Sequence, residues 1–226
     1  NTITANSSYG IRLNSSHSVA TLNHNNIYEN SGSYDLYSGV TYQEVDARFN
    51  YWGLTTTVIM GIASNPKNIS RIYDYHDGSS YSLVNYAGWL DGVDGSPTSA
   101  VGTTATTALT NSSYTSVTYY ESTDTAVYIE VTDADLNASA STADTAAVSI
   151  ATDTEAASSV TESVTLTETG ADTGVFRGSI ALSVGGSAGS DGTLAASVGD
   201  TVTLTYQDAA NDWGASVTVT DTATVV

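Results

Sequence analysis

The sequence predicts an all-β protein in two parts, a short right-handed parallel β-helix followed by an antiparallel β-sandwich. Three observations predict this fold class. An Asn-and-Ile motif recurs near the start at offsets of 24 and 25 residues, and short alternating apolar runs begin near residue 115. The charge also changes: residues 1–100 hold 8 acids and 4 bases, whereas the remaining residues hold 16 acids and one base. We therefore expect domains at 1–94 and 115–226, joined by a Ser/Thr/Gly linker at 95–114.

The first part repeats with the period of a solenoid coil. Asn1-Thr-Ile3 matches Asn25-Asn-Ile27 at an offset of 24, and Asn25 in turn matches Asn50 at an offset of 25. Repeats of this length, built from short apolar pieces and small polar corners, are typical of solenoids. About two coils are expected, which is fewer than solenoids generally need to bury a core. The first coil should offer unpaired backbone groups to another strand, so we expect either a longer parent chain to supply more coils or another chain to do so.

The motifs of this part resemble a known family. The runs Asn1-x-Ile3-x-x-Asn6 and Asn50-Tyr-Trp-Gly53 look like the closing coils of right-handed β-helix proteins of the pectate-lyase-like superfamily, including the periplasmic copper-binding-type β-helix family. The segment from Ile69 to Leu90 is similar to the one that covers the end of the solenoid there. The resemblance spans residues 1–91 and implies the terminal coils and cap of a β-helix.

Enzymes with this fold carry clusters of Asp, Lys, Arg and His on one outer face. Five residues are candidates for such a cluster: His17, His24, Asp35, Asp46 and Arg48. Asp46 and Arg48 share a face if their segment is a strand, because they lie two residues apart. No spacing places the five together, and the single lysine argues against lysine-dependent lyase chemistry. We expect no enzyme activity.

Aromatic residues are frequent towards the end of the first part. The set comprises Tyr51, Trp52, Tyr73, Tyr75, Tyr81, Tyr86 and Trp89. We expect these side chains to pack the end of the β-helix. A platform on which sugar rings stack is the alternative, since aromatic rings serve both purposes.

Alternation of apolar residues with Thr dominates the second part. Val127, Ile129 and Val131 share one face of a strand, and similar runs recur up to residue 219. Turn sequences separate these runs, which gives seven or eight short strands. An immunoglobulin-like antiparallel sandwich is the expected fold.

The second part also resembles a known repeat. Its motifs are Val127 to Asn137, Val164 to Gly170, Thr173 to Gly178 and Gly199 to Asp208. In this order they look like the Ig-like repeat of prokaryotic surface-layer and extracellular-matrix proteins, across residues 118–224. That resemblance implies a structural module without enzyme activity.

Acidic turns of the second part suggest a structural calcium ion. Asp133-x-Asp135-x-Asn137 offers alternate oxygen ligands, and Glu168, Asp208 and Asp212 offer more. Six to eight hard oxygen ligands suit Ca²⁺. The spacing does not match an EF-hand. Ordinary turn chemistry is the alternative, because Asp and Asn favour such turns.

Composition excludes several classes of function. A net charge of −19 repels nucleic-acid phosphates and anionic membranes, and the chain has no cysteine for disulfides or thiolate metal sites. The uncharged stretch 95–120 is too polar to insert into a bilayer. Binding of nucleic acid and membrane insertion are therefore not expected.

The remaining class is an extracellular or cell-surface structural protein, a self-assembling subunit or fragment of a filament, surface layer or matrix. Copies of the chain would be its partners, through end stacking of the β-helix or strand addition, for example by residues 217–226. The alternative is a secreted polysaccharide-binding or polysaccharide-cleaving β-helix protein with a sandwich accessory domain. A further alternative is an adhesin, with cell-surface glycans as partners.

Overall fold

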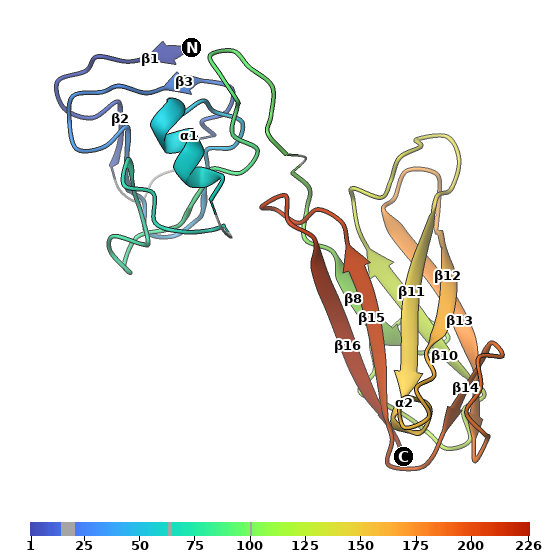
Figure 1. Ribbon diagram of the computed structural model, residues 1–226. Coiled ribbons are helices and arrows are strands. Elements are labelled where there is room, and N and C mark those ends of the chain that lie inside the picture. The colour runs from blue at the N-terminus through green and yellow to red at the C-terminus, as the bar shows by residue number, and fades with distance from the viewer. Residues whose placement is uncertain (15–20, 63–64, 100) are drawn as a thin grey trace. The chain divides into compact units, whose positions relative to one another are not determined.

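The computed structural model describes residues 1–14, 21–62, 65–99 and 101–226 and shows an all-β chain (Figure 1). The chain forms two compact units with separate hydrophobic cores. Unit 1 contains residues 1–101 and 212–214, and unit 2 contains residues 102–211 and 215–226. Within the described ranges, no helix is both long and apolar enough to cross a membrane.

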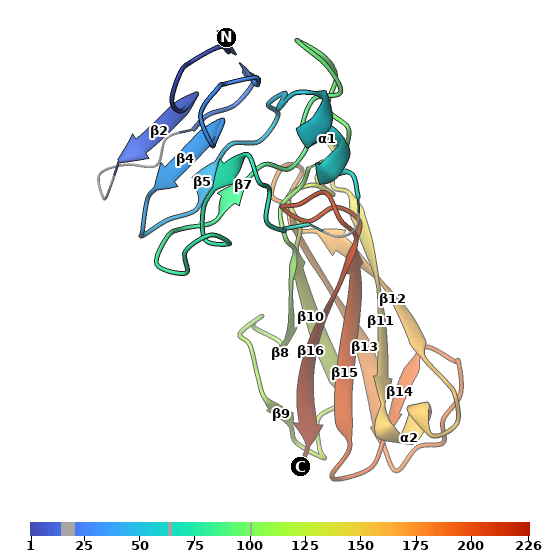
Figure 2. The ribbon, with the colours of Figure 1, turned by 60° about the vertical axis from the view of Figure 1, so that its left-hand side comes forward.

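Unit 1 is built from short parallel strands. Its elements are β1 (Thr2–Ile3), β2 (Ile11–Asn14), β3 (Asn26–Ile27), β4 (Leu36–Gly39), β5 (Val45–Asp46), α1 (Leu54–Met60), β6 (Ile72–Tyr73) and β7 (Val84–Asn85). The strands pair in parallel as β1–β3, β2–β4–β6 and β5–β7. Figure 2 shows β2 and β4 side by side.

The offsets of the sequence repeat are also the offsets between paired residues in β1–β3 and β2–β4. Thr2 pairs with Asn26 at an offset of 24, and Ile11 pairs with Leu36 at an offset of 25. The corner asparagines bond to each other, as Asn1 Nδ2 donates to Asn25 Oδ1 at 3.1 Å. The backbone N–H of Asn25 donates to Asn50 Oδ1 at 2.7 Å, and Asn50 is fully buried. Repeated asparagines therefore satisfy the backbone where successive turns of chain change direction.

Inward side chains of these strands form the core of unit 1. Ile27, Leu36, Ile72 and Val84 are buried, with Trp52 beside them. Helix α1 follows Gly53, whose φ of 81° is a conformation that glycine adopts readily. The helix buries Thr56 and Met60.

Unit 2 is a single curled sheet of nine strands. Its elements are β8 (Thr106–Thr110), β9 (Tyr119–Tyr120), β10 (Ala126–Thr132), β11 (Thr145–Thr152), α2 (Asp153–Ala156), β12 (Glu162–Glu168), β13 (Val175–Val184), β14 (Thr193–Ala196), β15 (Thr201–Asp208) and β16 (Val217–Val225). The order is β8-β10-β13-β12-β11-β15-β16-β9, with β14 paired to β13. Near the ends of this order, the N–H of Leu109 in β8 donates to Asp221 Oδ2 in β16 at 2.7 Å, so the sheet curls round on itself.

The alternation predicted for this unit is present. Val127, Ile129 and Val131 of β10 are buried in its core. The linker expected at 95–114 is wrong in part, because residues 106–110 form β8, which pairs antiparallel with β10. The run at 217–226 also has partners inside the chain, since β16 pairs with β15 and, at Thr224 and Val225, with β9. The structure therefore uses this run as an internal strand.

Candidate functional site

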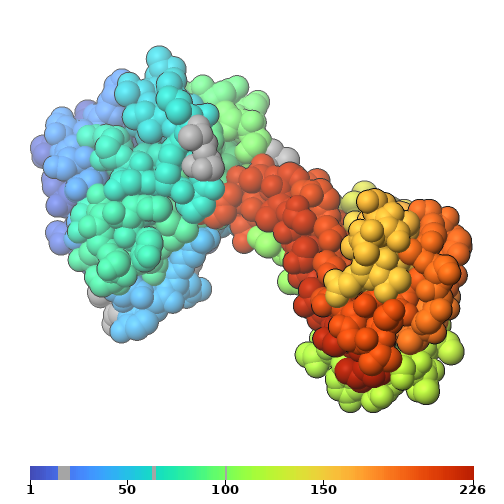
Figure 3. Space-filling model, turned by 60° about the horizontal axis from the view of Figure 1, so that its bottom comes forward, coloured from blue at the N-terminus to red at the C-terminus, as the bar shows by residue number. Residues whose placement is uncertain are grey.

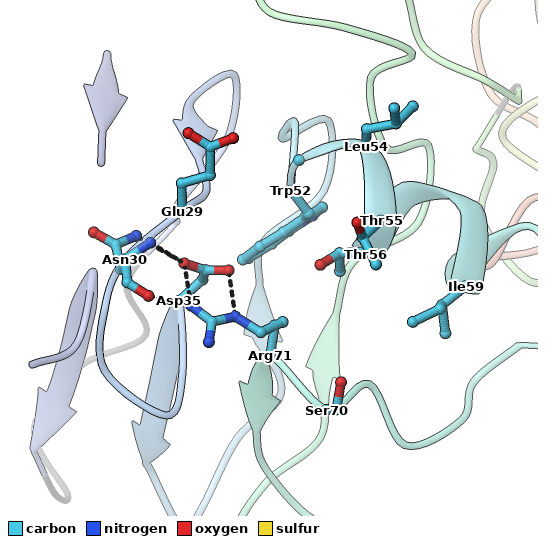
Figure 4. Close-up of a pocket in the computed structure, with 11 residues that line it drawn as sticks. Glu29, Asn30, Asp35, Trp52, Leu54, Thr55, Thr56, Ile59, Ser70 and Arg71 are labelled. Carbon is cyan, nitrogen blue, oxygen red and sulfur yellow. Dashed lines mark hydrogen bonds and ion pairs between the residues drawn. The ribbon is translucent and has the colours of Figure 1, made fainter. Parts of the chain in front are cut away.

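A cavity of about 580 Å³ in unit 1 lies between the strands and α1. Its wall includes Glu29, Asn30, Asp35, Trp52 and Arg71, and residues of α1 complete it (Figure 4). The cavity combines an aromatic ring, hydroxyl groups and charged groups. Such a mixture is typical of binding pockets.

An ion pair occupies one side of this cavity. Asp35 Oδ2 accepts a hydrogen bond from Arg71 Nε, and Asp35 Oδ1 accepts one from Arg71 Nη2, both at 2.9 Å. The Asp35 side chain is almost fully buried. Asn30 Nδ2 adds a third donor at 2.8 Å. These hydrogen bonds to Asp35 raise the pKa of Arg71.

The remaining donors of Arg71 are also used. Its Nη1 group donates to the carbonyls of Gly32 and Ser33, and Nη2 donates to the carbonyl of Asn30 at 2.6 Å. All five N–H groups of the guanidinium are therefore engaged within unit 1. The pair clamps the turn at 30–33 to β4 and β6, and Arg71 has no donor left for a ligand.

Trp52 brings a buried polar group without a partner to the wall of this cavity. The residue is 1% exposed, and its indole N–H has no hydrogen-bond partner among the described residues. A buried donor without an acceptor costs free energy of about 1–3 kcal/mol. An acceptor atom of a ligand is one means of recovering that cost.

The four catalytic candidates that the structure describes have different partners. Asp35 lies at the cavity, and Asp46 forms a separate pair with Arg48, whose Nε donates to Asp46 Oδ1 at 2.9 Å. Burial raises the pKa of Asp46, but hydrogen bonds from Arg48 and Asn23 outweigh that effect and hold the pKa below its usual value. The ring of His24 stacks on Phe49 at 5.3 Å. His17 lies outside the described residues.

Some aromatic residues of unit 1 are buried in its core, and others stack on the outer face of the strands. Trp52 and Tyr86 are buried in the core, as expected for packing. Tyr37 and Tyr73, in contrast, lie on the outer face of β4 and β6, with ring centroids 4.6 Å apart and planes 11° from parallel. The spacing matches that of adjacent strands.

This stack continues along the same face. Tyr34 and Tyr81 each make an edge contact with Tyr73, and Tyr9 lies 5.2 Å from Tyr37. The guanidinium of Arg12 lies over Tyr37 at 5.4 Å. We call this set, Tyr9, Arg12, Tyr34, Tyr37, Tyr73 and Tyr81, the tyrosine ladder.

The predicted calcium ligands mostly accept hydrogen bonds from the backbone or a hydroxyl. Asp133 is buried, and its Oδ1 accepts from the N–H of Asp135 at 2.9 Å while its Oδ2 accepts from the Tyr206 hydroxyl at 2.6 Å. Asp135 Oδ2 accepts from the N–H of Thr103 at 2.8 Å. Asp208 Oδ2 accepts a hydrogen bond from the N–H of Ala105 at 3.0 Å.

Glu168 and Asn137, two more of the predicted calcium ligands, also have hydrogen-bond partners. Glu168 Oε1 accepts from the N–H groups of Thr173 and Gly174, and the carbonyl of Gly174 accepts from Asp133. Gly174 therefore brings Asp133 and Glu168 together. Hydrogen bonds from the backbone, first that of Asp144, lower the pKa of Glu168. Asn137 Nδ2 donates to Asp172 at 2.8 Å.

Asp212 belongs to unit 1, whereas the other five predicted ligands belong to unit 2. Among the described residues, no group of three or more Asp, Glu, His or Cys side chains is arranged to hold a metal ion. The oxygens serve mainly as acceptors for loop N–H groups, which is the turn chemistry that the sequence also allowed. Calcium binding stays a prediction.

Two residues of consequence were missed from the sequence. Arg71 was not singled out, although a cation within an apolar run of a strongly acidic chain is a signal for a buried pair. Glu155 was also missed, although Thr152-x-x-Glu155 matches a capping box. Thr152 Oγ1 does accept from the N–H of Glu155 at 3.2 Å.

Comparison with models of known protein families and with curated proteins gave no match for this chain.

Proposed function

We propose that the chain is an extracellular structural protein that assembles with copies of itself through the free edge formed by β1 and β2. In this proposal unit 1 is a short right-handed parallel β-helix and unit 2 is an Ig-like sandwich. The parallel pairing at offsets of 24 and 25 residues supports the first assignment. Six strands with alternating buried residues, paired antiparallel, support the second.

The observation that carries the assembly proposal is that β1 and β2 each pair on one side only with the strands that the structure describes. The carbonyls of Asn1 and Ile3 accept hydrogen bonds from the N–H groups of Asn26 and Tyr28, and the N–H of Ile11 donates to the carbonyl of Asp35. In a parallel ladder, alternate residues bond to alternate sides. The N–H and C=O groups of Thr2 and Arg12 therefore face away from β3 and β4, where no strand lies among the described residues. Such an edge is a template for another strand.

Proline substitution tests this edge directly. Proline at position 2 removes the outward N–H and blocks approach with its ring, while the inward bonds of residues 1 and 3 are retained. Thr2→Val is the matched control, because it also loses the hydroxyl but keeps the N–H. We expect Thr2→Pro to weaken self-association in sedimentation velocity at least tenfold and Thr2→Val to leave it near wild type. A wild-type chain that stays monomeric at all concentrations would contradict the proposal.

Glycan binding is the second candidate function, and the tyrosine ladder is the observation that favours it. Stacked aromatic rings present flat apolar faces of the kind on which sugar rings pack, and Arg12 adds donors beside them. In a chain with five basic residues, a cation at this face favours acidic sugars.

A further inference from the structure

The chain contains five Asn-x-Ser sequons, the motif in which the side-chain amide nitrogen of Asn takes a sugar. Four of them lie wholly within the described residues and begin at Asn6, Asn68, Asn111 and Asn137. The fifth begins at Asn14, and its next two residues lie outside the described ranges. So short a motif arises often by chance, so the surroundings of each amide decide whether it is available for modification.

Three of the four amides already donate hydrogen bonds within the chain. Their acceptors are Asn30 Oδ1 at 2.8 Å for Asn6, the carbonyl of His76 at 3.4 Å for Asn68, and Asp172 Oδ1 at 2.8 Å for Asn137. Asn111 differs, because its hydrogen bonds to the described residues involve Oδ1 and leave Nδ2 without an acceptor. Asn111 is also exposed. Of these four sequons, the one at Asn111 presents a free amide nitrogen to solvent.

The turn that follows β8 fixes the orientation of this amide. Asn111 Oδ1 accepts hydrogen bonds from the N–H groups of Ser113 at 2.9 Å and Thr115 at 3.1 Å. The backbone of Asn111 also donates to the carbonyl of Thr115 and accepts from the N–H of Tyr114, both at 2.9 Å. Because an amide group is planar, an Oδ1 that faces these donors turns Nδ2 away from them. The turn therefore holds the nitrogen outward, beside the backbone of Ser113, which carries the hydroxyl of the sequon.

A cavity of about 240 Å³ in unit 2 adjoins this amide. Asn111 and Ser112 form part of its wall, and Val117 and Tyr119 add apolar surface. Tyr119 is 52% exposed, so its ring is accessible to a ligand. The yellow-green segment that includes residues 111–128 lies at the surface of unit 2 in Figure 3. A sugar on Asn111 therefore has an aromatic ring beside it, on which the apolar C–H face of a pyranose packs.

The charge of the cavity wall selects among sugars. Asp124 is the charged residue that lines the cavity, and no Lys or Arg lines it among the described residues. A carboxylate without a neighbouring cation repels an acidic sugar. The cavity therefore suits a neutral pyranose.

We propose that Asn111 is a site of N-linked glycosylation and that its first sugar is a neutral pyranose that packs against Tyr119. In the transfer, Asn111 Nδ2 forms a bond to C1 of an activated sugar, and the C1–O bond to a diphosphate carrier breaks. The carrier leaves with the electron pair of that bond, and the amide proton passes to a base of the transferase. The proposal rests on the extracellular location in the proposed function, and it does not depend on self-assembly.

Transfer of a single glucose to the folded, unmodified chain tests the site. The probe is a soluble N-glucosyltransferase with UDP-glucose, and mass spectrometry of peptides measures the occupancy of each sequon. Peptides from a digest of the same chain, in which the fold is lost, are the reference for the preference of the enzyme. Relative to that reference, we expect occupancy at Asn111 to exceed that at Asn6 and Asn137 about tenfold, because those amides must first give up a hydrogen bond. Occupancy at Asn111 no higher than at Asn6, Asn68 and Asn137 overturns the proposal.

A serine variant removes the sequon and keeps its turn. Ser113→Ala deletes the hydroxyl that transferases require, whereas Asn111 Oδ1 still accepts from the backbone N–H of residue 113. Ser70→Ala, which removes the sequon of Asn68, is the matched control. We expect the glucose at Asn111 to be lost in Ser113→Ala and kept in Ser70→Ala. Its persistence in Ser113→Ala would show that the sequon is not what the enzyme reads.

The melting temperature tests the packing against Tyr119. Glucose on Asn111 should raise the melting temperature of unit 2 in wild type and raise it less in Tyr119→Ala. Each variant is compared with and without glucose, so the effect of the substitution itself cancels. Equal rises would show that the sugar does not pack on Tyr119. Sedimentation of Thr2→Pro reports on assembly separately, so failure of this inference and failure of the proposed function are distinguishable.

Discussion

Glu155 accepts a hydrogen bond from the backbone N–H of Ala195 through Oε1 at 3.0 Å, while its Oε2 has no partner among the described residues. The residue is fully buried. Glu162 and Asp191 are the neighbouring charged groups, and both are acidic. Burial raises the pKa of Glu155, and these two carboxylates raise it further. The bond attaches α2 to β14, so a carboxyl group that resists ionisation holds these two elements together.

Glu155→Gln should change how stability depends on pH. A carboxyl with a raised pKa in the folded state costs no stability below its ordinary pKa, and the cost grows as pH rises towards the raised value. Glutamine keeps the oxygen that binds Ala195 and cannot ionise. We expect the melting temperature of Glu155→Gln relative to wild type to rise between pH 4 and pH 7. Parallel profiles for the two proteins would show that Glu155 is not the cause.

Arg71→Lys should destabilise unit 1 by about 2–3 kcal/mol, because Asp35 is buried and lysine cannot replace the paired donors of the guanidinium. Arg48→Lys is the matched control. The Asp46–Arg48 pair is partly exposed, so its loss should cost less than about 1 kcal/mol. Urea denaturation followed by tryptophan fluorescence measures both. Equal losses would contradict the clamp role of Arg71.

The sequence predicts most strands of this chain, but it predicts neither helix α1 nor strand β8. Repeated asparagines forecast the parallel register of Thr2 with Asn26, because each corner bonds to the next. Helix α1 was not foreseen, since Thr and Val dominate it and both favour strands, so tertiary packing of Met60 decides its form. The segment that forms β8 was taken for linker, because small residues hide its alternation.

The tyrosine ladder shows a second feature that the sequence repeat cannot predict. Tyr37 lies beside Tyr73, although 36 residues separate them and the repeat is 24 or 25 residues long. The intervening segment contains α1 and lengthens this turn of the chain. A search at constant period therefore cannot find the stacked pair, and only the folded chain brings Tyr9, Tyr37 and Tyr73 into one row.

Tyr206→Phe should destabilise unit 2 by about 2 kcal/mol, because it removes a hydroxyl donor from the buried carboxylate of Asp133. Tyr120→Phe is the control, since that hydroxyl donates to the neutral carbonyl of Thr110 at 2.9 Å. Its loss should cost about 1 kcal/mol. Thermal unfolding of both variants provides the comparison, and a larger loss for Tyr120→Phe would contradict this ranking.

Calcium should raise the melting temperature of unit 2 if the turn at 133–137 binds it, because residues 101–226 carry 16 acids and one base. Asp135→Asn should reduce that rise. Asp124→Asn, at the opposite end of β10 from Asp133 and Asp135, should retain it. Calorimetry with calcium and then with chelator makes the measurement. An unchanged melting temperature in wild type would exclude a structural calcium ion.

Glycan binding, the second candidate function, predicts that replacing a tyrosine inside the ladder weakens binding and that replacing one outside it does not. Tyr37→Ala removes the middle of the tyrosine ladder, where its ring stacks on Tyr73 and lies under Arg12. Tyr42→Ala is the control, because Tyr42 is 82% exposed and belongs to no ring contact among those of the described residues. Each stacked ring contributes about 0.5–1.5 kcal/mol, so retention of wild type on an acidic polysaccharide in affinity electrophoresis should fall about two- to tenfold in Tyr37→Ala alone. If wild type is retained on no acidic or neutral glycan of a panel, glycan binding is excluded as a function of this face, and the ladder only packs β2, β4 and β6.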